Sequence, residues 1–122
     1  MNKTELSELN GNQIFINSTN PNERLRLEIR SAATLQHKTD YLSKYNYAIR
    51  LMYIHYLKQG IDIKGNVVHK ALQQHLVQNY DIQEELVILL VKSRHNLKYN
   101  AVKPDNNIFE QLMRIIDLLQ TK

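Results

Sequence analysis

The stretch Tyr47-Ala-Ile-Arg-Leu-Met-Tyr-Ile-His-Tyr-Leu57 carries apolar side chains on almost every side of a helix. A helix of this kind is stable only when other elements surround it, so the pattern is typical of the central helix of a bundle. Gly60 follows closely and favours a left-handed end to the helix. The sequence therefore predicts a central helix over residues 46–59.

On the N-terminal side, Pro21 favours the start of a helix, because the first turn does not need the N–H that proline lacks. Helical spacing continues to about Tyr41. Residues 1–20 are polar, and we expect a flexible, irregular arm there that docks on the body through Ile14-Phe15-Ile16. Residues 21–122 would then form one helical domain. The inward stripe of its first helix is predicted to contain Leu25, Ile29, Ala32 and Leu35.

On the C-terminal side, a loop at residues 61–65 leads to a predicted helix over residues 66–79. Asp81 is followed three residues later by Glu84, and this spacing predicts a capped start for the next helix. That helix is rich in apolar residues, so we expect it to be central as well and to run to about Tyr99.

A last helix is predicted to open at Pro104 and Asp105 and to run to the C-terminus. The chain of 122 residues fits one domain, and its three glycines and two prolines are too few for the many turns of an all-β fold. Every connection is short, so neighbouring helices should run antiparallel. The fold class predicted is all-α, a four- to five-helix up-and-down antiparallel bundle.

Several classes of function are disfavoured by composition. Cysteine is absent, which excludes disulfides, a thiolate nucleophile and a cysteine zinc site. No P-loop or other glycine-rich phosphate motif is present, and the five histidines lack metal-ligand spacing. We therefore expect neither a metal nor a cofactor. The longest apolar run, Leu86 to Val91, is too short to span a bilayer, so we expect a cytoplasmic protein with no membrane contact.

Basic residues gather near the end of the helix predicted to close at Tyr99. No acidic residue lies between Leu86 and Pro104, in a chain with a net charge of +4. A positive surface of this kind attracts nucleic acid or an acidic protein. The alternative is a solvated basic surface that complements the helix dipole. The candidate nucleic-acid-binding residues are Lys92, Arg94, Lys98 and Lys103.

Two pairs of side chains in this segment have the spacing of neighbours on a helix. Arg94 and Lys98 form one pair, and His95 and Tyr99 form the other. A guanidinium group binds phosphate through its planar fork, while histidine and tyrosine can stack on a base or move a proton. The candidate catalytic residues are therefore Arg94, His95 and Tyr99.

The order of these elements resembles the HEPN superfamily of small helical bundles over about residues 35–119. The superfamily signature is an arginine, a polar residue, three further residues and a histidine. Arg94 and His95 match its first two positions, and Tyr99 stands where the histidine is expected, as in a branch with an Arg-to-Tyr ending. The other matching pieces are Tyr45-Asn-Tyr-Ala48, Gly60-Ile61, the helix that contains His69, and the stretch from Asp81 to Val91.

This resemblance implies a homodimer that binds RNA or a nucleotide. Many members are metal-independent ribonucleases of toxin–antitoxin or defence systems, and others bind a partner nucleotidyltransferase. The tyrosine places catalysis in doubt, because a phenol with a pKa near 10 is a poor general base at neutral pH. Arg50 and His55 form a second arginine–histidine pair at this spacing, inside the central helix, where Arg50 is expected to pair with a carboxylate.

Two other classes of function stay open on the sequence alone. The chain fits a non-enzymatic helical interaction protein, such as an antitoxin, an immunity-type protein or a phage inhibitor. It also fits a helix-turn-helix DNA-binding protein that reads DNA with the helix over residues 66–79, although that helix contains no arginine.

Overall fold

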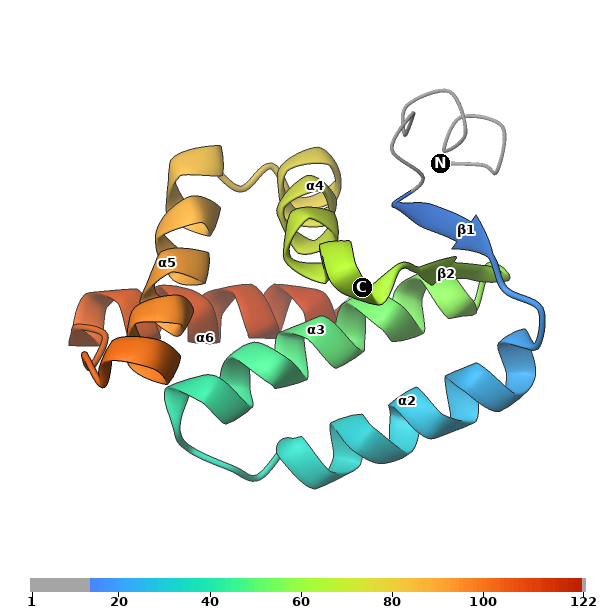
Figure 1. Ribbon diagram of the computed structural model, residues 1–122, viewed down its shortest axis with the longest axis horizontal. Coiled ribbons are helices and arrows are strands. Elements are labelled where there is room, and N and C mark those ends of the chain that lie inside the picture. Colours follow the sequence, from blue (N-terminus) through green and yellow to red (C-terminus); the bar gives the residue numbers. More distant parts are fainter. Residues whose placement is uncertain (1–13, 122) are drawn as a thin grey trace.

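The computed structural model describes residues 14–121 (Figure 1). Within this range the protein is a mostly helical bundle, as predicted, with one small two-stranded sheet. The elements in chain order are β1 (Phe15–Asn17), α2 (Pro21–Leu35), α3 (Tyr41–Leu57), β2 (Ile61–Ile63), the 3-10 turn η1 (Gly65–Val67), α4 (Val68–Tyr80), α5 (Glu84–Asn100) and α6 (Asn106–Thr121).

Helix α3 is the centre of the bundle and contacts α2, α4, α5, α6 and β2. In Figure 1 α2 lies along one side of α3, while α4 and α5 stand on the other side at a steep angle to it. Tyr45, Ala48 and Met52 on α3 have no exposed surface. The prediction of a central helix is therefore confirmed, because its apolar residues face neighbours on all sides.

The boundary between the first two helices differs from the prediction. Helix α2 ends at Leu35 rather than near Tyr41, and α3 begins at Tyr41 rather than near residue 46. The side chain of Asp40 accepts a hydrogen bond of 3.1 Å from the backbone N–H of Ser43. This cap satisfies a free donor of the first turn, so it fixes the start of α3.

The inner face of α2 contains a charge that the apolar spacing did not predict. Glu28 is 3% exposed, whereas Ile29, which was expected to face inward, is 49% exposed. A buried carboxylate is tolerated only when it is paired. Arg50 on α3 lies 2.8 Å from the Glu28 carboxylate, and Arg24 lies 3.2 Å from it. Arg24 also binds Asp62 of β2 at 3.0 Å, so this network joins three elements.

The expected arm and the loop at residues 61–65 each contribute a strand instead of irregular structure. Strand β1 pairs antiparallel with β2, and Phe15 lies opposite Ile63. Ile14 is 1% exposed, so this end of the arm docks on the body as expected. The alternation Ile61-Asp62-Ile63 buries both isoleucines and leaves the aspartate more exposed. Residues 1–13 of the expected arm lie outside the described residues.

Asp81 does not begin a helix as predicted. It ends α4 in the left-handed conformation, with φ at 57°, and α5 starts three residues later at Glu84. Aspartate tolerates this conformation better than most residues, so it can end a helix as well as cap one. Helix α5 is also less central than predicted, because it buries only Val87 and Leu90 fully. None of the described helices is long and apolar enough to cross a membrane.

Candidate functional site

Arg94 lies on the C-terminal half of α5 and turns toward α3. Its guanidinium carbon lies 5.7 Å from the ring centroid of Tyr45. The side chain is half-buried, and its Nε is buried without a hydrogen-bond partner among residues 14–121. The ion pairs between described side chains are those of Arg24 and Arg50 with Glu28 and Asp62, and Arg94 takes part in none of them. Arg94 is therefore a partly desolvated cation that no carboxylate of the described chain neutralises.

Tyr45 connects Arg94 to a histidine on a third helix. Its side chain is fully buried, and its hydroxyl oxygen lies 2.8 Å from Nδ1 of His69 on α4. The two rings are 5.6 Å apart at their centroids. Burial raises the pKa of Tyr45 well above its usual value, although the charge of Arg94 opposes this shift. The phenol therefore keeps its proton at neutral pH.

His69 is half-buried at the start of α4. Burial lowers its pKa below the usual 6.5, and the positive charges of Arg94 and Lys98 lower it further. The imidazole is therefore neutral at pH 7. Because α4 and α5 form an antiparallel hairpin, residues about equally far from the turn at residues 81–83 come together across it. Helices α3, α4 and α5 thus gather a phenol, an imidazole and a guanidinium at one place.

His95 and Tyr99 form a separate, outer pair on α5. Their ring centroids are 4.7 Å apart, and Tyr99 is 61% exposed. The Lys98 ammonium lies 5.4 Å from the Tyr99 ring centroid, and Lys92 and Lys103 are exposed. Both rings therefore present accessible surface beside positive charge.

The sequence placed Arg94, His95 and Tyr99 in one cluster; the Arg94 guanidinium lies over the Tyr45 ring, whereas His95 packs against Tyr99. Successive residues point about 100° apart around a helix, so Arg94 turns inward while its neighbour turns outward. Tyr45 and His69 were not predicted from the sequence as members of the site. Only the pairing of residues across the α4–α5 turn could have indicated His69, and nothing local indicated Tyr45.

The second arginine–histidine pair does not form a site. Arg50 binds Glu28 at 2.8 Å, as the sequence predicted for a carboxylate partner. His55 instead packs its ring against Tyr56 and His75, at 5.0 and 4.9 Å between centroids. Over the part of the chain that the structure describes, no three histidine, aspartate or glutamate side chains gather where they could hold a metal ion.

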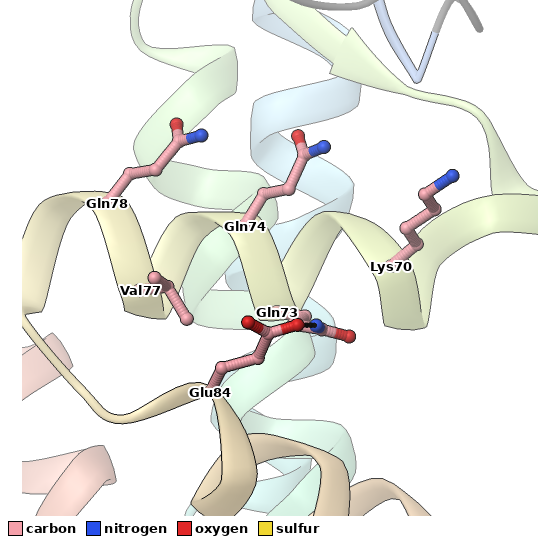
Figure 2. Close-up of a pocket in the computed structure, with 6 residues that line it drawn as sticks. All are labelled: Lys70, Gln73, Gln74, Val77, Gln78 and Glu84. Atoms are coloured by element: carbon pink, nitrogen blue, oxygen red, sulfur yellow. Dashed lines mark hydrogen bonds between the residues drawn. The ribbon is translucent and has the colours of Figure 1, made fainter.

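A polar hollow of about 280 Å³ lies along α4 where it faces the start of α5. Figure 2 shows Lys70, Gln74 and Gln78 in a row on one side of α4. Beneath them, the amide of Gln73 donates a hydrogen bond of 3.0 Å to Glu84. Three glutamine amides and the apolar side chain of Val77 therefore line the same hollow. The lining residues are Lys70, Gln73, Gln74, Val77, Gln78 and Glu84.

Comparisons of the chain with family models, with curated proteins and with solved structures give no match.

Proposed function

We propose that this protein binds RNA or a nucleotide through a phosphate group at the C-terminal half of α5. The observation that carries the proposal is the half-buried Arg94, whose guanidinium has no carboxylate partner among residues 14–121. Partial burial of an unpaired cation costs free energy, and a bound anion would offset that cost. Lys98 follows one turn later and Lys92 is nearby, so the positive field extends along the helix.

The outer pair supports a nucleic-acid ligand rather than a simple anion. Tyr99 offers a largely exposed aromatic face, with His95 beside it. Bases of single-stranded nucleic acid stack on such faces, and each stacking contact contributes about 1–3 kcal/mol. An arginine for phosphate and an exposed ring for a base are the two elements that single-strand recognition requires.

The proposal includes the resemblance to the HEPN superfamily. The protein would then be a cytoplasmic homodimer that acts in a toxin–antitoxin or defence system. Endoribonuclease activity would need a group that accepts a proton near neutral pH. Tyr99 stands where the motif histidine would supply such a group. Binding, rather than cleavage, is the activity that the described side chains support best.

Anisotropy of a labelled single-stranded RNA of about ten nucleotides tests the proposal. We expect affinity to fall steeply as salt rises, and Arg94→Gln to weaken binding about tenfold. Arg30→Gln is the matched control, because Arg30 is exposed on α2, across α3 from the site. Equal losses in the two variants, or no RNA binding by the unmodified protein, would refute the proposal.

A second hollow supports the alternative class, a protein that acts by binding a protein partner. It measures about 400 Å³ between α3, the end of α6 and Tyr80 of α4, and Leu51, Ile54 and Leu119 are among its lining residues. A stoichiometric complex with a partner protein would favour this function under three conditions. The complex should persist after ribonuclease treatment, it should still form with Arg94→Gln, and it should not form with Lys58→Glu. The lining residues are Leu51, Ile54, His55, Lys58, Tyr80, Leu119 and Gln120.

A further inference from the structure

His69 and Tyr45 lie outside the segment on which the sequence placed the site, yet Tyr45 contacts both Arg94 and His69. We propose that His69 donates a hydrogen bond from Nε2 to a bound phosphate group, beside Arg94 and Lys98, and that Tyr45 is a positioning residue which fixes the donating tautomer. This inference rests on the proposed function, and it adds a ligand-contacting residue from a second helix.

The first step concerns the proton of the Tyr45 hydroxyl. This group is fully buried, and Nδ1 of His69, at 2.8 Å, is its hydrogen-bond partner within the described range. A buried hydroxyl proton without an acceptor costs about 1–3 kcal/mol, so the phenol is the donor and Nδ1 the acceptor. A neutral imidazole that accepts at Nδ1 carries its proton on Nε2.

The second step concerns the charge of His69. Protonation would put a proton on Nδ1 as well, and the Tyr45 hydroxyl would lose its acceptor. The groups that face the imidazole from neighbouring helices are Tyr45 on α3 and the cations Arg94 and Lys98 on α5. All of them oppose an imidazolium, and burial lowers the pKa in the same direction. His69 therefore serves as an uncharged donor at neutral pH, and its Nε2 cannot accept a proton.

The third step concerns the kind of ligand that fits. The site offers a guanidinium fork with a free buried N–H, an ammonium and an imidazole N–H. Nε2 of His69 makes no hydrogen bond to another described residue, and no carboxylate contributes to the electrostatics of the imidazole. Because these three groups all donate hydrogen bonds, they suit a ligand group that only accepts them. A phosphate group of an RNA backbone or of a free nucleotide is such a group.

The tautomer is measured directly by nitrogen-15 NMR of the histidine rings in the full chain at pH 7.5. We expect an unprotonated, acceptor-type shift for Nδ1 of His69 and a protonated shift for Nε2. In Tyr45→Phe, which keeps the ring beneath Arg94 and removes only the hydroxyl, the two tautomers should mix. A proton on Nδ1 in the unmodified protein would overturn the positioning role of Tyr45, and this measurement needs no variant to fold.

Phosphate binding is followed by titrating inorganic phosphate, then 5′-AMP, then a 2′-O-methyl oligonucleotide that cannot be cleaved by transesterification. Each ligand that enters the site should shift the Nε2 signal and raise the pKa of His69, because a nearby anion favours the imidazolium. A response to 5′-AMP alone assigns the site to free nucleotides, and a stronger response to the oligonucleotide assigns it to an RNA backbone. No response of His69 to any of the three overturns the inference.

The matched variants are His69→Phe and His37→Phe, which each replace an imidazole by an apolar ring. We expect His69→Phe to weaken oligonucleotide binding at least tenfold, which is roughly the lower end of the value of one hydrogen bond to a charged group. His37→Phe should change it less than twofold, because His37 is exposed just after α2 and lies on none of the three helices that form the site. If Arg94→Gln weakens binding and His69→Phe does not, this inference fails and the proposed function stands.

If the unmodified protein binds none of the three ligands, both proposals fail. RNA cleavage at saturating RNA that His69→Phe abolishes, and that falls as His69 becomes protonated, would also overturn the inference, because it would show that Nε2 accepts a proton. Binding retained in Arg94→Gln but lost in His69→Phe would overturn the proposed function, since phosphate recognition would then not depend on the arginine.

Discussion

Arg50 of α3 lies 2.8 Å from the carboxylate of Glu28, a residue that is only 3% exposed in the middle of α2. The partner of Glu28 within its own helix, Arg24, also binds Asp62 of β2. The ring of Tyr53 adds cation–π contacts to this network. The guanidinium carbons of Arg24 and Arg50 lie 5.6 and 5.2 Å from its centroid. Glu28 therefore holds α2 against the centre of the bundle through charge.

Removal of the Glu28 charge should destabilise the protein. Glu28→Gln leaves two arginines without their shared anion, and we expect the free energy of unfolding to fall by about 2 kcal/mol. This is below the loss for a fully buried pair, because both arginines reach solvent. Urea denaturation measures the change. Glu110→Gln, on the exposed side of α6, is the control, and equal losses would contradict the role of the network.

Replacement of Arg94 should separate binding from stability. Arg94→Met keeps a long side chain against Tyr45 and removes a partly buried cation that has no carboxylate partner in the described chain. We expect the urea midpoint to stay the same or rise, while RNA affinity falls about tenfold. Arg50→Met is the contrasting variant and should destabilise, since it leaves Glu28 buried with one partner fewer. A loss of stability in Arg94→Met as large as in Arg50→Met would contradict the site.

Tyr99 should contribute to RNA binding through its ring alone. We expect Tyr99→Ala to weaken RNA binding five- to tenfold, in line with about 1 kcal/mol for one stacked base, and Tyr99→Phe to bind normally. The urea midpoint should not change in either variant, because 61% of this side chain is already exposed. Normal binding by the alanine variant would remove the base from the proposed mode of recognition.

Stability should fall in mild acid because of the half-buried histidines His55 and His69. Burial lowers the pKa of His55 and of His69 below 6.5. The unfolded chain therefore binds protons at these positions before the folded chain does. The stability that comes from keeping them neutral is fully present above about pH 6.5 and is lost as pH falls through the lowered pKa values. Urea midpoints measured from pH 7.5 to pH 5 should decrease, and the decrease should be smaller in His69→Phe. A midpoint that does not change with pH would contradict the partial burial of both rings.

The N-terminal cap of α3 should also be measurable. Asp40→Ala removes the acceptor for the Ser43 N–H and should lower the free energy of unfolding by about 1 kcal/mol. Thr39→Ala, at the preceding exposed position, is the control and should leave stability unchanged. The hydrogen bond to Ser43 lowers the pKa of Asp40 below 3.8, so the difference between the two variants should disappear as pH falls through that lowered value.

The sequence was sufficient for the central helix, because the stretch from Tyr47 to Leu57 has no polar face. It was insufficient at Asp40 and Asp81, since the same residue type begins one helix and ends another. The three-residue strands were missed because pairing between Phe15 and Ile63 depends on contacts far apart in the chain. A periodic pattern reports burial along one helix, but it cannot report which partner covers that helix.

The same limit applies to the candidate site. The basic side chains of α5 were evident in the sequence, as was the helical spacing of Arg94 with Lys98. Tyr45 and His69 join Arg94 only when α4 folds back on α5 and both helices pack on α3. A buried tyrosine near the start of the central helix is indistinguishable, in sequence, from any other aromatic core residue.

The pairing of β1 with β2 has a consequence for how the chain reaches this fold. The ladder joins Phe15 to Ile63, so the whole α2–α3 hairpin lies within the loop that it closes. Closing a long loop for a few backbone hydrogen bonds is entropically unfavourable until the intervening helices have already shortened it. The ladder should therefore be a late event on the folding pathway and the first part of the described chain to exchange its amide protons, well before the core of α3.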